Sequence, residues 1–225
     1  MQEYLPVLRR APIFAGIDEG EISSMLTCLH AREGRYEKGE YLLRVGDATD
    51  SVGLLLAGGA LIVQESFWGV RNLVSQVTPG QLFAEAFACS PGATLNVSVE
   101  ADEPCAVLWL GVGRILTTCP SACAFHTRMI RNLLSELAEK NLHLGEKLGH
   151  IGQRTTREKL LSYLSAEAQR RGTAEFDIPF TRQQLADYLS VERSAMSAEL
   201  GKLRDAGALR FDKNHFCLLV PPAEF

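Results

Sequence analysis

A repeating apolar pattern in the second half of the chain constrains the fold more than any other feature. Six apolar residues and one asparagine follow one another at alternating steps of four and three: Ile130, Leu134, Leu137, Asn141, Leu144, Leu148 and Ile151. This spacing indicates a heptad seam on one long α-helix, about 30 Å in length at roughly 1.5 Å per residue. A second copy of the helix would cover such a narrow stripe, so we interpret it as a parallel homodimer contact in which Asn141 sets the register. The alternative is that the stripe packs on the chain's own N-terminal domain.

Short β-type runs punctuated by glycine fill the region from Arg35 to Leu110. Residues 52–57 and 60–65 flank the pair Gly58-Gly59, for example, and Pro79-Gly80 follows a further run that ends at Val77. Many short strands with glycine turns at near-regular spacing predict an antiparallel sandwich or barrel. The first half of the chain is therefore expected to be rich in β-structure.

Composition indicates an ordinary globular protein with an uneven charge distribution. The chain has 225 residues, of which 46% are hydrophobic and 22% charged, and its net charge is −4. Residues 1–149 carry 12 Lys/Arg against 17 Asp/Glu, whereas residues 150–225 carry 11 against 10. Because nucleic-acid-binding proteins are usually basic, DNA binding requires that the positive charges of the second part gather on one face.

Two further features concern the location of the protein in the cell. The first 30 residues contain neither a secretory leader nor an apolar run of the roughly 18 to 20 residues that a membrane span needs, so we expect a cytoplasmic protein with no membrane partner. Six cysteines are scattered through apolar or helical stretches: Cys28, Cys89, Cys105, Cys119, Cys123 and Cys217. This distribution favours reduced, mostly buried thiols over a disulfide framework.

The segment from Thr181 to Leu200 predicts a helix-turn-helix. Thr181 can cap a first helix, residues 190–192 form a three-residue turn, and a second helix runs from Arg193 to about Ala206. The inward-facing residues of the two helices are apolar: Leu185, Ala186, Leu189, Met196, Leu200 and Leu203. After a break at residues 149–156, a preceding helix over residues 157–168 completes the helical part of the domain.

The outer face of the second helix offers candidate contacts to DNA bases. Arg193, Ser194 and Ser197 lie on this face together with Gly201, and short polar side chains allow a helix backbone to approach base edges in the major groove. Arg193 suits a bidentate contact to guanine. The alternative interpretation is a solvated helix face without a ligand.

A strand pair around Lys213-Asn214 follows and predicts a wing. A basic rim that holds DNA phosphates is predicted from five residues: Arg182, Lys202, Arg204, Arg210 and Lys213.

The order of barrel, long helix and winged helix resembles the cyclic-AMP receptor and fumarate-nitrate regulator (Crp/Fnr) family of transcription regulators. The start Thr181-Arg182-Gln183 and the run from Arg193 to Leu200 are similar to its reader domain. The resemblance implies an α+β fold with a double-stranded β-helix (a jelly roll like that of cyclic-nucleotide-binding domains) over residues 1–118. A dimerisation helix and hinge over 119–152 and a winged helix-turn-helix over 153–225 would follow.

The resemblance also implies partners and site residues. It implies an effector-gated homodimer that binds a palindromic operator in double-stranded DNA and contacts RNA polymerase. Thr181, Arg182 and Gln183 would contact phosphates, and Arg193 would contact a base. Family members often carry a glutamate where Ser194 stands and an arginine where Ala198 stands, so the operator sequence does not follow from the resemblance.

The sensor segment from Pro79 to Ala88 resembles the family's phosphate-binding cassette, with Glu85 in the place of the residue that holds a ribose hydroxyl. Nucleotide-binding relatives have an Arg-Ser pair where Leu95-Asn96 stands, and a hydroxyl pair where Leu144-Gly145 stands. Loss of the arginine leaves a buried cyclic phosphate without its bidentate partner, which opposes cyclic-AMP binding.

We therefore expect a different, less charged small effector, of unknown identity, and no required cofactor. The predicted pocket consists of six residues: Phe83, Ala84, Glu85, Leu95, Asn96 and Leu144.

Two other functions are possible on this pattern. A redox or haem-based gas sensor of the same family could use His30, Cys89 or the closely spaced Cys119, Cys123 and His126. Relatives that hold an iron-sulfur cluster use a group of closely spaced N-terminal cysteines, whereas this chain has only Cys28 before residue 80, so we interpret its cysteines as packing residues and predict no metal site.

A jelly-roll metalloenzyme is the second alternative. It would need two or three histidines inside the barrel, and residues 31–125 contain none, so we predict that the protein is not an enzyme.

Overall fold

The computed structural model describes residues 2–65, 68, 71–116 and 124–219, and it forms two compact units. The units comprise Met1–Glu139 and Lys140–Phe225. Their boundary falls inside the long helix α5 (Ala124–Ile151), because the first half of this helix packs in one unit and the second half in the other.

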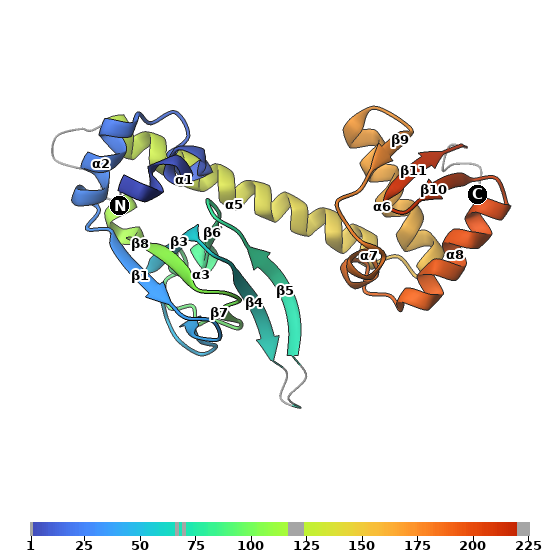
Figure 1. Ribbon diagram of the computed structural model, residues 1–225, viewed down its shortest axis with the longest axis horizontal. Helices are drawn as coiled ribbons and strands as arrows, with labels where there is room; N and C mark the ends of the chain where they lie inside the picture. The colour runs from blue at the N-terminus through green and yellow to red at the C-terminus, as the bar shows by residue number, and fades with distance from the viewer. Residues whose placement is uncertain (1, 66–67, 69–70, 117–123, 220–225) are drawn as a thin grey trace. The chain divides into compact units, whose positions relative to one another are not determined.

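Two four-stranded antiparallel sheets form the centre of the first unit (Figure 1), in the orders β1-β8-β3-β6 and β2-β7-β4-β5. The strands are β1 (Arg32–Tyr36), β2 (Tyr41–Leu43), β3 (Ser51–Ala57), β4 (Ala60–Glu65), β5 (Arg71–Val77), β6 (Leu82–Phe83), β7 (Ser98–Ala101) and β8 (Cys105–Gly111). The predicted double-stranded β-helix is therefore confirmed. Strand β1 begins three residues before the predicted start at Arg35, because its polar sequence gives little apolar alternation.

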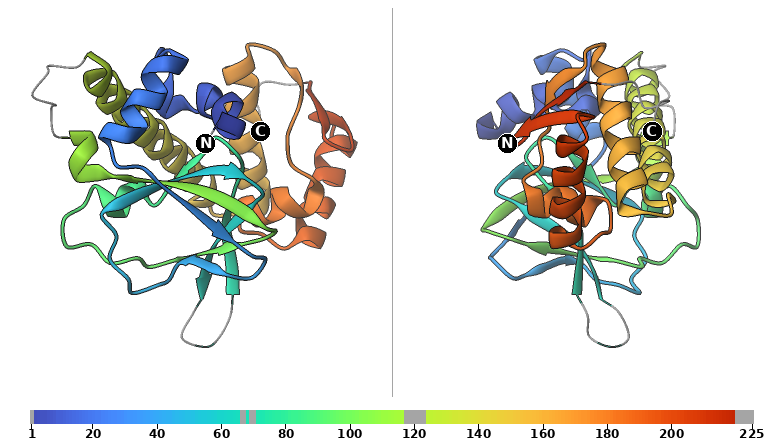
Figure 2. Two further views of the ribbon diagram at one scale, coloured as in Figure 1. Left: turned by 60° about the vertical axis from the view of Figure 1, so that its left-hand side comes forward. Right: turned by 90° about the vertical axis from the view of Figure 1, so that its right-hand side faces the viewer.

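The sheet β1-β8-β3-β6 separates two hydrophobic cores. Leu55 and Val107 point into the space between the two sheets, while their neighbours Leu54 and Leu108 point to the opposite side. This alternation is the period of two that a β-strand buried on both faces requires. Figure 2 shows helices covering the second side. These are the short elements η1 (Gln2–Tyr4), α1 (Leu5–Arg10), η2 (Pro12–Phe14), α2 (Glu19–Cys28) and α4 (Val112–Leu116), with the first half of α5.

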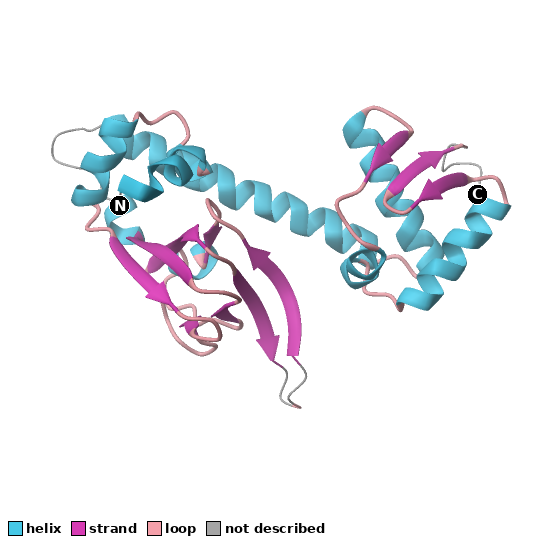
Figure 3. Cartoon of the chain, viewed as in Figure 1, coloured by secondary structure: helices cyan, strands magenta, loops and turns pink. Residues whose placement is uncertain are grey.

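The second unit packs helices α6, α7 and α8 with a three-stranded antiparallel sheet of order β10-β11-β9 (Figure 3). Its elements are α6 (Thr156–Arg171), β9 (Glu175–Asp177), α7 (Arg182–Tyr188), α8 (Arg193–Asp205), β10 (Leu209–Asp212) and β11 (His215–Leu218). Helix α6 begins with a capping box between Thr155 and Glu158 and ends at Gly172, which adopts a left-handed conformation with φ 66°. The predicted break before this helix and the predicted wing are confirmed.

The predicted heptad seam is divided between two environments. Ile130 and Leu137 are half-buried against the core of the first unit. For these two residues the alternative interpretation applies, in which the stripe packs on the chain's own N-terminal domain. Leu134, Leu144 and Leu148 are 61%, 59% and 64% exposed. Asn141 is exposed as well, as is Leu142, which lies outside the predicted seam. A 3.6-residue period locates an apolar stripe on a helix but does not say which neighbour covers each part of it.

The prediction of mostly buried thiols is wrong for the cysteines that the structure describes. Cys105 is buried, Cys89 and Cys217 are partly exposed, and Cys28 is exposed, all as free thiols. Cys119 and Cys123 lie outside the described residues. Within the described part of the chain, no helix is both long and apolar enough to span a bilayer.

Candidate nucleic-acid interface and effector pocket

Helix α7 begins at a capping box, as predicted. The side chain of Thr181 accepts a hydrogen bond from the Gln184 backbone nitrogen at 3.3 Å, and the Gln184 side chain accepts one from the Thr181 nitrogen at 2.8 Å. Two backbone N–H groups at the helix start are thereby satisfied. Leu185 and Ala186 are fully buried, which fixes the helix against the core of the second unit.

The turn between α7 and α8 is sharp and ends in an acidic cap. Ser190 adopts a left-handed conformation with φ 51°. Glu192 is the N-cap of α8, and its carboxylate accepts hydrogen bonds from the backbone nitrogens of Ser194 at 2.8 Å and Ala195 at 3.1 Å. These bonds lower the pKa of Glu192, with the hydroxyl of Ser194 as the largest contributor. The sequence does not indicate this cap, because glutamate is not among the favoured N-cap residues.

The two faces of α8 are as predicted. Met196 and Leu203 are fully buried, and Leu200 is 1% exposed, so this side is anchored in the core. Arg193 and Ser197 are exposed on the other side. Ser194 is also exposed, but its hydroxyl donates a hydrogen bond to the Glu192 carboxylate. The structure therefore groups the three predicted base-contacting residues at the N-terminal end of α8 and commits one of them to the cap.

The wing is the β10–β11 hairpin. Asp212 pairs with His215 across a two-residue turn in which Lys213 has φ 50°. The side-chain amide of Asn214 donates a hydrogen bond to the Ile178 carbonyl at 3.1 Å, which ties the turn to the segment after β9. Lys213 is thus held at an exposed tip, as a phosphate contact requires.

Three other predicted phosphate contacts interact with neighbours inside the unit. The Lys202 Nζ lies 2.6 Å from the Glu199 carboxylate, and the Gln183 amide donates a hydrogen bond to Asp187 at 2.8 Å. The guanidinium of Arg182 packs over two aromatic rings of the wing, and burial lowers its pKa. Their roles toward DNA stay predictions.

The predicted effector pocket begins at the junction of β6 and the short helix α3 (Glu85–Ala88). Ala84 adopts a left-handed conformation with φ 62°, and Glu85 is 6% exposed. Phe83 is 1% exposed, and its ring meets Trp109 edge-on at 5.4 Å between centroids. Gly53 lies directly beneath Phe83, since a Cβ there would be 2.1 Å from the ring. Phe83 is therefore a core residue, and the structure assigns it packing contacts rather than a free surface.

The other three predicted pocket residues lie in different surroundings. Leu95 is buried and its backbone is hydrogen-bonded to Gly46 and Asp47, whereas Asn96 is exposed. Leu144 is exposed and belongs to the second unit. That these residues line one pocket stays a prediction.

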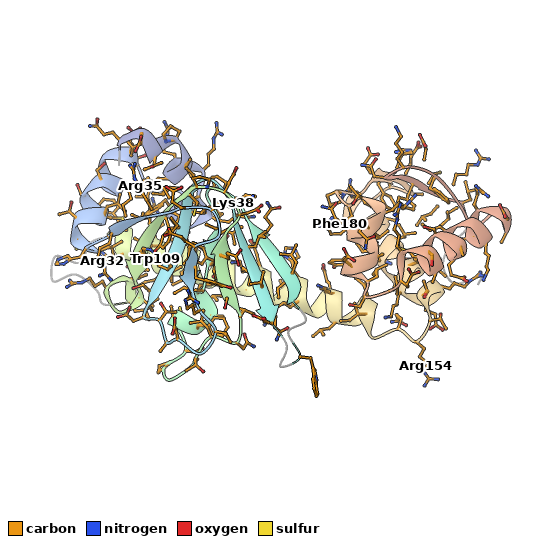
Figure 4. The ribbon with its side chains drawn as sticks, turned by 60° about the horizontal axis from the view of Figure 1, so that its bottom comes forward. Arg32, Arg35, Lys38, Trp109, Arg154 and Phe180 are labelled. Carbon is orange, nitrogen blue, oxygen red and sulfur yellow. The ribbon has the colours of Figure 1, made fainter. Side chains whose placement is uncertain are left out.

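A hollow of about 790 Å³ lies elsewhere in the first unit, and none of the six predicted residues lines it. Its walls come from β1, β2, the start of β3 and the loop after α3. Arg32, Tyr36 and Trp109 contribute the largest side chains, and Figure 4 labels the first and last of them. The Trp109 indole donates a hydrogen bond to the Tyr36 hydroxyl at 3.1 Å.

Comparison with known families gives the two units their identity. A model of the cyclic nucleotide-binding domain matches residues 33–119, and a model of the Crp-like helix-turn-helix domain matches residues 158–223. The chain belongs to the Crp/Fnr family of transcription regulators. This family consists of DNA-binding regulators rather than enzymes, which confirms the prediction from the sequence.

Individual relatives support the same assignment over nearly the whole length of this Crp/Fnr regulator. It is 25% identical to the transcriptional activator protein FnrL of Cereibacter sphaeroides, in a match that covers 93% of this chain and 84% of FnrL. Its fold is similar to that of CprK in complex with OCPA, with TM-score 0.61, 14% identity and coverage of 87% and 89% of the two chains. The c-di-GMP responsive regulator CLP of Xanthomonas campestris has TM-score 0.58 and 17% identity, with coverage of 91% and 100%.

Proposed function

We propose that this Crp/Fnr regulator acts in the cytoplasm as a homodimer, which binds a palindromic DNA operator under the control of a small effector. The observation that supports sequence-specific DNA binding is the arrangement of α8. Its inner face is fixed in the core through Met196 and Leu200, while Arg193 and Ser197 are exposed one turn apart. Ala195 lies between these two residues in the chain and Ala198 follows Ser197. Both alanine side chains are short, so the helix backbone can come close to base edges in the major groove.

Each residue at this end of α8 has a distinct role in the proposal. Arg193 reads a guanine through two hydrogen bonds, and Ser197 contacts the next base along the groove. Glu192 holds Ser194 and closes the helix start. A carboxylate at that position repels phosphate, so the phosphate contacts come instead from the wing tip at Lys213 and from the start of α7.

A second copy of the chain is the partner that we propose for the exposed leucines of α5. Leu134, Leu142, Leu144 and Leu148 are each about 60–70% exposed within a single copy. Each leucine that becomes buried contributes about 1.5–3 kcal/mol, and parallel association of two identical helices along the seam buries Leu134, Leu144 and Leu148 of both copies. Dimerisation also sets two copies of α8 about 34 Å apart, the distance between successive major grooves on one side of DNA. Contact with RNA polymerase is proposed from the family resemblance alone.

The proposed effector is less charged than a cyclic nucleotide. Leu95 occupies the position of the phosphate-binding arginine and is 2% exposed, so a buried phosphate there would face an apolar side chain. Burial of a phosphate charge without a paired cation costs several kcal/mol. Ala84 and Glu85, at the start of α3, are the residues through which we propose that effector binding acts.

Substitution of Arg193 tests the function directly. Operator fragments selected from random duplexes by the wild-type protein would be compared with a scrambled duplex of equal length. Arg193→Ala is expected to weaken operator binding by about 1–3 kcal/mol, with a much smaller effect on the scrambled duplex. Arg10→Ala removes an exposed arginine of α1 and serves as the matched control. Equal losses on both duplexes, or a wild-type protein that selects no sequence, would refute the proposal.

A further inference from the structure

The hollow of about 790 Å³ in the first unit has the size and lining of a binding site, although it lies outside the predicted effector pocket. Small-molecule sites in proteins typically enclose about 300–1,000 Å³. Leu42, Leu43 and Ala93 contribute apolar surface, and Thr49 and Ser51 contribute hydroxyl groups. The hollow can therefore hold a ligand of the size of an amino acid that has both an apolar and a polar part.

Two aromatic side chains form one wall of the hollow. Tyr36 of β1 and Trp109 of β8 both line it, and a hydrogen bond from the indole to the tyrosine hydroxyl joins them. Gly34 leaves the space for this contact, since a Cβ there would lie 3.0 Å from the Trp109 Nε1 and from the Tyr36 ring. Trp109 is nevertheless partly exposed. A fixed indole with an exposed part offers a surface on which an aromatic ring can pack.

Arg32 and Asp50 bring opposite charges to the same hollow. Arg32 is the cross-strand partner of Trp109, and both are labelled in Figure 4. Its exposed guanidinium forms no ion pair with any residue that the structure describes. Asp50 is exposed as well, and its carboxylate accepts a hydrogen bond from the Ser51 hydroxyl at 2.8 Å but pairs with no cation of the described chain. One positive and one negative group are thus available to a ligand.

Glu33, the third charged residue of the lining, already has a partner. It follows Arg32 in β1, so its side chain points to the opposite face of the strand, and its carboxylate lies 2.9 Å from the Arg35 Nε. A second hollow of about 620 Å³ shares Arg32, Asp50 and Trp109 with the first. The two available charges therefore lie where the hollows meet, beside the indole.

We propose that this hollow binds a free aromatic α-amino acid in its zwitterionic form. The guanidinium of Arg32 holds the α-carboxylate, for which its planar group can supply two parallel hydrogen bonds. The carboxylate of Asp50 accepts hydrogen bonds from the α-ammonium group, and the aromatic ring packs against Trp109. A carboxylic acid without an ammonium group, or a phosphate dianion, would leave Asp50 unpaired and be repelled by it. The proposal goes beyond the proposed function, because it assigns a ligand class to a hollow that the effector argument does not use.

Calorimetric titration of the full-length protein with L-phenylalanine, L-tyrosine and L-tryptophan tests the proposal. At least one of them is expected to bind at one site per chain, and about 10-fold or more tightly than L-alanine, which lacks the ring. Arg32→Gln and Asp50→Asn should each weaken this binding about 10-fold or more, because each removes a charged hydrogen-bond partner. Both residues are exposed, so neither change affects the core. Arg35→Gln, on the opposite face of β1, is the matched control and should bind like wild type.

Analogues of the bound amino acid identify which group each residue holds. For phenylalanine these are phenylpropanoate, without the ammonium group, and phenethylamine, without the carboxylate. Arg32→Gln should bind the amino acid and the amine with similar affinity, and Asp50→Asn should do so for the amino acid and the acid. Wild-type protein that binds none of the three amino acids, or either variant with wild-type affinity, would overturn the proposal. Equal affinity of wild type for the amino acid and the acid would overturn the role of Asp50.

These titrations contain no DNA, so their outcome is separate from that of the operator experiment. Absence of amino-acid binding in a protein that selects an operator overturns this proposal and leaves the proposed function intact. A protein that binds the amino acid as expected but selects no DNA sequence supports this proposal and refutes the proposed function.

Discussion

The guanidinium carbon of Arg182 lies 4.9 Å from the centroid of the Phe216 ring, which joins the first residue of α7 to the wing strand β11. The same guanidinium lies 4.8 Å from the ring of Phe211 in β10. Burial lowers the pKa of Arg182, as expected for a cation that has lost part of its water. This residue therefore holds the wing against the helix-turn-helix, in addition to any contact that it makes with DNA.

Arg182→Ala is expected to destabilise the protein, because it removes this packing. A cation over aromatic rings contributes about 1–2 kcal/mol when partly desolvated. Arg182→Lys keeps the charge but loses the planar group, so it should recover less than half of the loss. Urea unfolding followed by far-UV circular dichroism measures the difference in the free energy of unfolding between wild type and each variant. Arg210→Ala, at an exposed position of β10, is the control. Unchanged stability in both Arg182 variants, with weaker DNA binding, would instead make Arg182 a phosphate contact only.

Lys213 and Lys202 form a natural pair for testing phosphate contacts. Lys213 is at the exposed wing tip, whereas the Lys202 ammonium already lies 2.6 Å from Glu199. Lys213→Ala should weaken binding to operator and scrambled DNA alike, and it should reduce the slope of log affinity against log salt by about 1 per protomer. Lys202→Ala should change the slope less. Affinity measured at four salt concentrations gives both slopes, and a loss confined to the operator would contradict this role for Lys213.

His215 links the stability of the wing to pH. Its ring nitrogens lie 3.0 Å from the Asp177 carboxylate and 3.1 Å from that of Glu175, and these hydrogen bonds raise the pKa of His215. The charged form is therefore favoured in the folded state. Its stabilising effect is fully present below the unfolded pKa of about 6.5 and is lost as pH rises through the folded pKa.

Thermal melting of His215→Asn tests this sign. The melting temperature of wild type should exceed that of the variant most clearly near pH 6, and the difference should shrink toward pH 9. His143→Asn changes an exposed histidine of α5 and should show no such trend. A difference that grows with rising pH would contradict the assignment.

Local signals explain which parts of the second unit could be predicted from the sequence. The cap at Thr181, the buried positions of α7 and α8 and the hairpin around Lys213 all depend on residues close together in the chain. Capping residues and the period of the apolar positions can be recognised in a single sequence, because they reflect backbone hydrogen bonds and helix geometry within a short segment. The strands β4 and β8 were predictable for a similar reason, since glycine or proline stands near their ends.

Contacts between distant residues could not be predicted in this way. Nothing in the sequence around Arg182 indicates that two wing phenylalanines cover it, and nothing around Cys28 indicates that its neighbour is His126, 98 residues away. The motif around Phe83 predicts a pocket residue, and it does not indicate that the absence of a side chain at Gly53 lets the Phe83 ring enter the core. These relationships depend on how strands and helices pack, which local periodicity does not determine.

Helix α5 is a further case in which local periodicity does not determine the neighbour. The sequence pattern placed Leu144 and Leu148 on a dimer seam, and the structure leaves both more than half exposed in one copy. If a second copy covers these two leucines, a glutamate at either position either becomes a buried charge or forces the two copies apart. Both outcomes weaken the dimer. The double variant Leu144→Glu, Leu148→Glu should therefore raise the dimer dissociation constant by at least about 100-fold, since two leucines per chain are lost.

Sedimentation equilibrium across a range of protein concentrations measures this change. Leu73→Glu is the matched control, because Leu73 is 63% exposed but lies on strand β5. Each protomer of the double variant should keep its fold, since neither leucine belongs to a core, and it should lose operator affinity because two linked recognition helices bind far more tightly than one. A double variant that remains dimeric would place the contact between copies elsewhere than on α5.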